Sequence, residues 1–456
     1  MPTAVAHPHT WRLAFGGIVI IIAAIILAQF FSWTAIAILT FGVVGAALGL
    51  AYPEWAIYAL AFFAPMSGLA IDFSQDQSLA RLPFLGSINA PFVDLLAVGV
   101  LVVCWLLFFI RPDVIDLKRT LKFSGFFAAF YVCVALSAYF ADPLFLGTVV
   151  KSFFRPYVFF YLAFAVPVIA LLHSKPKLLR TMYAYELACV LGALMGIVSL
   201  FTEHSVGFMR AIPFSVFGFA PFGTNQNVLA ESLVAIIPFA WWFAFKQKHD
   251  PVLRNTMFFF AGLISFVSLI TFSRAAWIVM TMQAVLFFWW HSRYSSSRHA
   301  KEIDARAIAI ALTVLAIFFL IIQSTVVADT SDETRKDLLG IAVQYFQRSP
   351  IVGIGPGMYL PTVDDTTTFH MDYGAAMDAH GVIQKLILEL GALGTITFFA
   401  WLGAIGVSLW KRRASGFHFM MFMTFASLWG YQLFNTGYFD AKVWVLMGVA
   451  LASLWI

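Results

Sequence analysis

The chain has 456 residues, of which 61% are apolar, 17% aromatic and only 11% charged. Soluble proteins carry about 25% charged residues, so this composition excludes a soluble globular protein. The mean hydropathy of +0.88 comes from apolar runs along the whole chain rather than from one anchor, which indicates a polytopic integral membrane protein.

The apolar runs are continuous and about as long as a membrane-spanning helix, unlike the alternating strands of an outer-membrane barrel. We therefore expect an all-α fold with about 12 transmembrane helices and about 14 as the upper bound, because several runs are short and closely joined. Either number is even and predicts both termini on one side. The runs are 13–30, 33–51, 53–66, 92–110, 123–141, 150–172, 183–201, 227–245, 256–272, 275–291, 307–327, 391–410, 417–434 and 441–456.

Basic residues predict the orientation. Five loops rich in Lys and Arg, at 111–122, 173–180, 246–255, 292–306 and 411–413, alternate with poorer loops, so we expect them, with both termini, in the cytoplasm. The other basic residues after Arg12 fall on the outer side or at outer helix ends, where orientation does not explain them. They are Arg81, Lys151, Arg155, Arg210, Arg274, Arg335, Lys336, Arg348, Lys385 and Lys442.

The longest loop, 328–379, lies on the outer side between the runs 307–327 and 391–410 of a chain expected to form one membrane domain, 1–456. Thr330 and Glu333 have the spacing of a helix-capping box, and Pro350 would end the helix. We predict an amphipathic helix lying against the membrane. Its apolar positions are Leu338, Leu339, Ala342, Val343 and Phe346.

Arginines near the bilayer are costly unless they face a cavity or a partner, which makes four of them candidates. Arg274 is either an interfacial arginine or an anion-binding residue at a break between half-helices. Arg155 has Lys151 one turn earlier, and an anion would stabilise these two cations. Arg210 could instead pair with Glu203.

Arg335 has the alternative of pairing with Asp332 or Glu333 on the predicted outer helix. Together, the four arginines predict a positive cavity on the outer face, suited to a phosphate or diphosphate. The glycines of 353–357 lack the Lys and Ser or Thr of a phosphate-binding loop, so we interpret this segment as a tight turn.

His380 opens a helix at the outer surface, with Asp378 before it and Lys385 after it. A neutral histidine there can take a proton from a sugar hydroxyl, although an ordinary surface histidine is an open alternative. His370 and Asp372 could join Asp378 and His380 around a divalent metal, but no helical i, i+4 spacing supports this, and we expect neither metal nor cofactor.

Asn227 stands with Asn225 and Glu231 where an outer loop enters a helix. It is either the helix N-cap or an amide that lines the cavity.

Four segments in this order resemble the bacterial O-antigen ligase and polymerase superfamily over residues 205–410. They are GTNQNVLAESLVAIIPF, TFSRAAWIVM, the R-x-x-L helix that runs into RSPIVGIGPGMYL, and AHGVIQKLILELGALGTITFF. The resemblance implies a metal-independent GT-C glycosyltransferase of the inner membrane, which uses an undecaprenyl-diphosphate-linked glycan at the periplasmic face. In the ligase branch the acceptor is a sugar of the lipid A core.

The family's essential arginine corresponds to Arg274 and its loop histidine to His380, while Arg155, Arg210 and Arg335 are matched more loosely. Many relatives have Asn after the histidine, where this chain has Gly381. Our hypothesis is that the arginines hold the donor diphosphate and His380 activates the acceptor hydroxyl for inverting transfer, supported by a further set of residues. That set is Asp378, Lys385 and Asn227.

Two other functions remain open. A polymerase or a protein O-oligosaccharyltransferase would use the same donor with another acceptor. A small-anion transporter is disfavoured because the candidate residues gather at one face and mostly in the second half of the chain, whereas transporters tend to have related halves around a central site.

Overall fold

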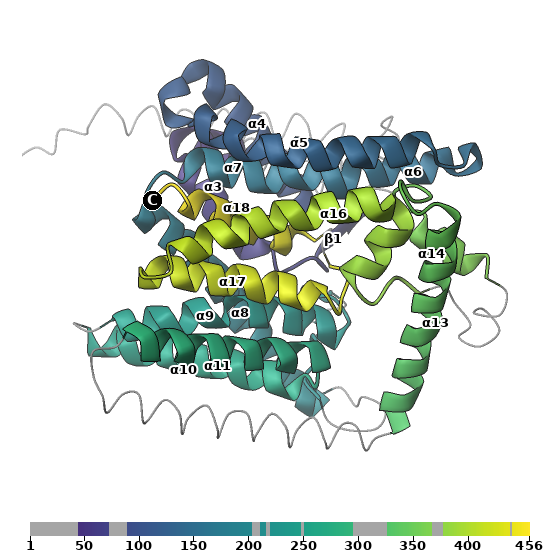
Figure 1. The fold of residues 1–456 in the computed structure, drawn as a ribbon. Coiled ribbons are helices and arrows are strands. Elements are labelled where there is room, and N and C mark those ends of the chain that lie inside the picture. Colours follow the sequence, from purple (N-terminus) through teal and green to yellow (C-terminus); the bar gives the residue numbers. More distant parts are fainter. Residues whose placement is uncertain are drawn as a thin grey trace, which may run out of the picture.

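The computed structural model describes residues 44–72, 89–202, 210–215, 219–247, 250–294, 326–366, 377–437 and 440–456. The predicted run at 13–30, and most of those at 33–51 and 307–327, lie outside these residues. The described part is a bundle of helices, most of which run in roughly the same direction (Figure 1).

The first half of the described chain is helical apart from two short strands. A β-pair forms between β1 (Ala70–Asp72) and β2 (Asn89–Pro91), which are antiparallel with Ala70 opposite Pro91, so the expected all-α fold needs this small correction. The helices are α3 (Pro53–Phe63), α4 (Phe92–Ile110), η3 (Pro112–Val114), α5 (Leu117–Tyr139), η4 (Pro143–Phe145), α6 (Leu146–Ser152), η5 (Phe153–Phe159), η6 (Tyr161–Ala165), α7 (Val166–Leu171) and α8 (Lys175–Thr202).

The second half carries the longer helices and the candidate site. They are α9 (Gln226–Lys246), α10 (Pro251–Ile270), α11 (Arg274–Tyr294), α13 (Val326–Arg348), α14 (Tyr359–Asp364), α16 (Val382–Lys411), α17 (Gly416–Gln432) and α18 (Ala441–Ser453).

Six helices of the described chain are long and apolar enough to cross a membrane, which supports an integral membrane protein. They are Phe92–Ile110, Pro143–Leu171, Lys175–Thr202, Gln226–Lys246, Pro251–Ile270 and Val382–Lys411. Other apolar helices are shorter, at 124–139 and 441–453. The larger number of spans expected from hydropathy stays a prediction.

Pro156 shapes the second of these spans, which continues from η4 to α7. A proline has no amide hydrogen, and its ring clashes with the carbonyl four residues earlier, so a regular α-helix does not continue through it. The chain widens into π-helical turns at Phe153–Phe159 and Tyr161–Ala165 and then returns to α-helix.

The helix α16 is broken toward its N-terminal end at Gly391, which has φ 62° and ψ −165°. The break frees the carbonyls of Leu388 and Glu389, which accept the N–H groups of Ile354 at 3.1 Å and Gly355 at 3.0 Å. A Cβ at position 391 would lie 2.5 Å from the carbonyl oxygen of residue 351, so only glycine fits. The glycine-rich segment is therefore a tight turn, as predicted, and it docks onto the broken helix.

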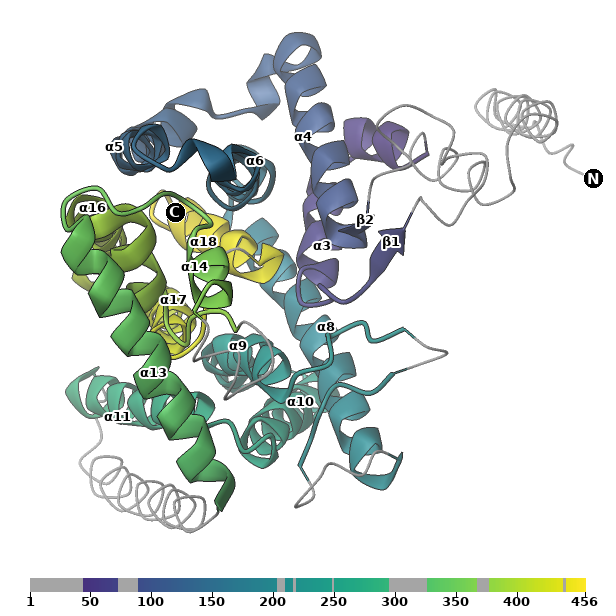
Figure 2. The same ribbon diagram turned by 90° about the vertical axis from the view of Figure 1, so that its right-hand side faces the viewer.

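The helix α13 crosses the end of the bundle, roughly perpendicular to the other helices (Figures 1 and 2). Leu338 and Ala342 are buried in a small cluster with Tyr359, whereas Leu339 and Val343 are 49% and 41% exposed. One part of the predicted apolar face is thus buried inside the protein, and the other part is exposed on its surface. Contact of this exposed part with a membrane stays a prediction.

The capping box predicted at Thr330 and Glu333 is wrong. The helix begins at Val326, so Thr330 lies inside it rather than at its N-cap. Apolar residues before Thr330 continue the helix by one more turn, which a search for capping residues overlooks.

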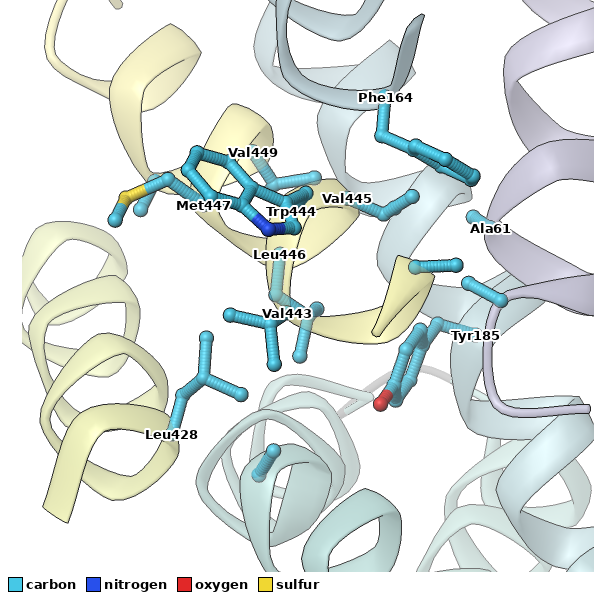
Figure 3. Close-up of a cluster of buried hydrophobic side chains, with 14 of the residues drawn as sticks. Ala61, Phe164, Tyr185, Leu428, Val443, Trp444, Val445, Leu446, Met447 and Val449 are labelled. Atoms are coloured by element: carbon cyan, nitrogen blue, oxygen red, sulfur yellow. The ribbon is translucent and has the colours of Figure 1, made fainter. Parts of the chain in front are cut away.

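The C-terminal helix α18 is the centre of the bundle, and every residue from Ala441 to Ser453 is buried. Figure 3 shows its side chains among Ala61 of α3, Phe164 of η6, Tyr185 of α8 and Leu428 of α17. A helix that is apolar on all sides is stable only when other helices surround it. The first residues of α18 therefore give a fixed attachment to the loop that precedes this helix.

Candidate active site

His380 lies immediately before Gly381, the N-cap of α16, and is half-buried. Its N–H donates to Gln384 Oε1 at 3.1 Å, which ties the residue to the first turn of the helix. Gly381 has φ 155°, and a Cβ there would lie 2.5 Å from the carbonyl oxygen of Leu433. Glycine is therefore required at this position by a close backbone contact.

Asp378 and Lys385 form an ion pair beside His380. Lys385 Nζ donates to both carboxylate oxygens of Asp378, at 2.8 and 2.7 Å, and Oδ1 also accepts the N–H of Ala379 at 2.8 Å. No hydrogen bond to the imidazole of His380 is found within the described residues. Asp378 and Lys385 were both predicted as supporting residues, and in the structure they form an ion pair with each other.

Two of the predicted arginines act on His380 from different helices. Burial is the main cause that lowers the pKa of His380 below its ordinary value of 6.5. The positive charge of Arg335 lowers this pKa further, and that of Arg274 does so to a smaller extent, whereas the negative charge of Asp378 raises it. Arg335 comes from α13 and Arg274 from α11, so residues far apart in sequence converge here. The result is a neutral imidazole at neutral pH, whose pKa both guanidinium groups lower.

Arg274 is the first residue of α11, after a three-residue turn that follows α10. The turn contains Phe272 at φ 55°, and Ser273 Oγ hydrogen-bonds the hydroxyl of Tyr431 at 2.9 Å. α10 and α11 have 20 and 21 residues, so Arg274 stands between two complete helices rather than at a break between half-helices. The free amides at a helix N-terminus also favour an anion there.

Tyr359 is a neighbour of the site that the sequence did not single out. Its N–H donates to the buried carboxylate of Glu389 at 3.2 Å, and its hydroxyl donates to the carbonyl oxygen of Leu338 at 3.2 Å. Burial, followed by the charges of Asp378 and Glu389, raises its pKa well above the ordinary value, so the hydroxyl stays protonated. Tyr359 thus connects α14 to both α13 and α16.

A known sequence family matches the stretch of chain that contains most of α10, then α11, α13 and the beginning of α16. Residues 257–399 match the family model described as O-Antigen ligase. The chain carries an O-antigen ligase domain. The resemblance is therefore confirmed, over a shorter stretch than residues 205–410. No curated protein matches the chain significantly.

Five of the predicted site residues lie inside the matched residues 257–399, namely Arg274, Arg335, Asp378, His380 and Lys385. Arg274 and Arg335 both lower the pKa of His380. The family indicates an enzyme of the glycosyltransferase kind with lipid-linked glycan substrates. Arg155, Arg210 and Asn227 lie outside the matched residues.

Arg155 pairs with Asp94, a residue that the sequence analysis missed. Its Nη2 lies 3.0 Å from Asp94 Oδ2, while 49% of the arginine side chain remains exposed. Asp94 is 61 residues away, at the start of α4 in an apolar run, so no local pattern pointed to it. The anion expected beside Lys151 and Arg155 is at least in part this carboxylate.

Arg210 lies where the ends of α8 and α10 meet. The N–H of Ala211 donates to the carbonyl oxygen of Ile270 at 2.9 Å, and that of Ile212 donates to Ser199 Oγ at 3.1 Å. Arg210 Nε is buried and has no hydrogen-bond partner among the described residues. Glu203, its alternative partner, lies outside them.

Asn227 is not the N-cap of α9. Asn225 is the cap, because its Oδ1 accepts the N–H of Asn227 at 2.8 Å. The carbonyl oxygen of Asn227 accepts the Tyr431 hydroxyl at 2.8 Å. The position therefore touches the site through its backbone.

The metal alternative cannot be built from the described residues. His370 and Asp372 lie outside them, and both oxygens of Asp378 are held by Lys385. Within the described part of the chain, no group of three or more His, Cys, Asp or Glu side chains has the arrangement of a metal site.

Proposed function

We propose that this protein is an O-antigen ligase, a GT-C glycosyltransferase that moves a polysaccharide from undecaprenyl diphosphate to a lipid A core sugar. It would work at the periplasmic face of the bacterial inner membrane, as a single membrane domain with both termini in the cytoplasm. The observation that carries the proposal is the half-buried, neutral His380, whose pKa Arg274 and Arg335 both lower. A base and two diphosphate-binding cations are what a glycan transfer from a lipid diphosphate needs.

In the proposed reaction, the neutral imidazole of His380 takes the proton of the acceptor hydroxyl. The hydroxyl oxygen then attacks the anomeric carbon from the face opposite the diphosphate, so the configuration inverts. The bond between that carbon and the diphosphate oxygen breaks, and its electron pair stays on the diphosphate. Arg274 and Arg335 stabilise the developing charge, which is the larger contribution because no metal takes part in this scheme.

The other predicted residues take secondary roles. Arg155 keeps nearly half of its side chain exposed while it pairs with Asp94, so it can contact the diphosphate as well. Arg210 offers a buried Nε without a partner in the described chain. Asp378, Lys385 and Asn227 shape the surroundings of His380 and Arg274.

The experiment is transfer by the purified protein in nanodiscs, with an undecaprenyl-diphosphate glycan, lipid A core and EDTA. We expect product from the wild type and none from Arg274→Ala or His380→Ala. Arg348→Ala is the matched control, because Arg348 is another outer arginine on α13 and stacks 4.5 Å from the ring of Tyr345. Full transfer by His380→Ala or Arg274→Ala contradicts the proposed mechanism.

The same assay separates the related activities. Replacing the lipid A core by a second lipid-linked glycan tests a polymerase, and replacing it by a protein acceptor tests a protein O-oligosaccharyltransferase. Product only with one of these acceptors would reassign the enzyme while keeping the donor.

A further inference from the structure

A buried carboxylate, Glu231 of α9, connects three consecutive pieces of the C-terminal chain. It accepts hydrogen bonds from Gln432 Nε2 at the end of α17 and from Asn435 Nδ2 in the following turn, the latter at 3.1 Å. It also lies 3.2 Å from Lys442 Nζ at the start of α18. One carboxylate therefore joins α9 to α17, to the turn and to α18.

Lys442 is 0% exposed and has a second carboxylate, that of Asp440, at 3.0 Å. It is the second residue of α18, where the helix dipole disfavours a cation, and a buried charge is costly without partners. Both ion pairs are thus needed to keep the lysine there. Gly437 packs against this network, since a Cβ would lie 2.7 Å from both oxygens of Glu231.

From this anchored segment, contacts reach both sides of the candidate active site. Thr436 Oγ1 donates to the carbonyl oxygen of Ala379 at 2.6 Å, directly before His380. Tyr431 hydrogen-bonds Ser273 Oγ at 2.9 Å, directly before Arg274. One short segment therefore contacts the backbone that presents the histidine and the turn that presents the arginine.

We propose that the segment Tyr431–Gly437, anchored on Glu231 together with Lys442, is the positioning element that holds His380 and Arg274 in register with each other. The segment follows residue 399 and Glu231 precedes residue 257, so both lie outside the stretch that matches the O-antigen ligase family. Thr436 and Tyr431 are its two positioning residues. The inference rests on the proposed function, because it assigns a role in that same reaction.

The test uses variants that leave the buried ion pairs intact, because removal of Lys442 or Glu231 alone would leave a buried charge unpaired and prevent folding. Thr436→Val removes the hydroxyl but keeps the shape of the side chain, and Thr436→Ser restores a hydroxyl. Thr424→Val is the matched control, since Thr424 is another buried threonine, which lies within α17 and whose hydroxyl donates to Met420 Sδ at 3.9 Å.

For Thr436→Val we expect kcat to fall about tenfold, the loss that corresponds to one hydrogen bond. The KM for the lipid-linked donor should stay within about twofold, because the diphosphate contacts remain. Thr436→Ser should recover most of the rate, and Thr424→Val should behave as wild type. For Tyr431→Phe, we expect the donor KM to rise instead, because the turn before Arg274 loses a hydrogen bond.

The pH profile separates positioning from loss of stability. The charged groups that act on His380 are Arg335 of α13, Arg274 of α11 and Asp378 of its own segment. If Thr436→Val lets the imidazole move toward solvent, the pKa rises toward 6.5 and the acid limb of the rate shifts to higher pH. A variant that merely unfolds more easily loses active protein with no shift of this limb.

Wild-type kcat and pH profile in Thr436→Val, with His380→Ala inactive, would overturn the positioning role and leave the proposed function intact. A rate loss in Thr436→Val that Thr436→Ser does not recover would also overturn it. Transfer by His380→Ala and Arg274→Ala would instead refute the proposed function itself.

Discussion

Lys385 Nζ holds both carboxylate oxygens of Asp378, at 2.8 and 2.7 Å, on the N-terminal side of α16. The lysine lies in the second turn of the helix, and the aspartate lies two residues before His380. The positive charge of Lys385 compensates the charge of Asp378, the one group in this set that raises the pKa of His380. Burial and the nearby positive charges therefore dominate the pKa of His380 and keep its imidazole neutral.

The Asp378–Lys385 pair leads to a first prediction, with opposite signs for its two partners. Lys385→Met leaves the Asp378 charge uncompensated, which raises the pKa of His380 and moves the acid limb of the transfer rate to higher pH. Asp378→Asn removes the charge that raises this pKa, so the limb moves to lower pH. Initial rates over a series of pH values measure both shifts. Shifts in the same direction would contradict this account.

Arg335 has two separable effects on the site. Arg335→Gln should lower kcat by about 10²-fold, as for loss of one donor to a developing anion, and should raise the pKa of His380 by removing a nearby positive charge. Arg335→Lys keeps the charge but loses bidentate binding, so the rate falls while the acid limb stays in place. Rates and pH profiles of the two variants test this. An unchanged limb in Arg335→Gln would show that its charge does not reach the histidine.

Arg155 is predicted to bind the donor in the ground and transition states alike. Arg155→Ala should therefore raise the donor KM by about three- to tenfold with little change in kcat. Asp94→Asn provides the comparison, because it removes the ion pair while leaving the guanidinium in place. A KM that stays at the wild-type value in Arg155→Ala would restrict Arg155 to its structural pair with Asp94.

The break in α16 predicts a large difference between two glycines of the same helix. Gly391→Ala introduces a side chain at φ 62° and 2.5 Å from a backbone oxygen, so it should destabilise the protein by at least about 1–3 kcal/mol. Gly403→Ala adds a methyl group in open space within a regular helix, and we expect it to be neutral or stabilising by about 0.5–1 kcal/mol. Thermal unfolding in detergent compares them. Equal unfolding temperatures would show that the break is not needed.

Local patterns predicted much of the helical framework because hydropathy and helix-stopping residues act over a few residues. The helices α8, α9, α10 and α16 follow the predicted runs, and α13 ends at Arg348 before Pro350. The start of α13 was wrong, and Asn225 rather than Asn227 caps α9. Helix ends depend on single hydrogen bonds, which composition does not specify.

The candidate residues could be chosen from the sequence because charges are rare in this chain and an arginine or histidine near the bilayer requires a reason. That argument selected Arg274, Arg335 and His380 but did not assign their partners. Asp94 for Arg155 and Glu231 for Lys442 are 61 and 211 residues away in sequence, within apolar helices. The local sequence around Asp94 or Glu231 does not indicate which basic residue each one pairs with.

Local sequence was enough to predict a helical membrane protein with a few charged residues available for chemistry, because burial in lipid acts on each segment separately. The effect of two arginines, from α11 and α13, on the histidine before α16 became visible only in the folded chain, as did the contacts of Tyr431 and Thr436 on both sides of the site. These relationships depend on how separate helices pack, and the packing is set by the whole chain at once.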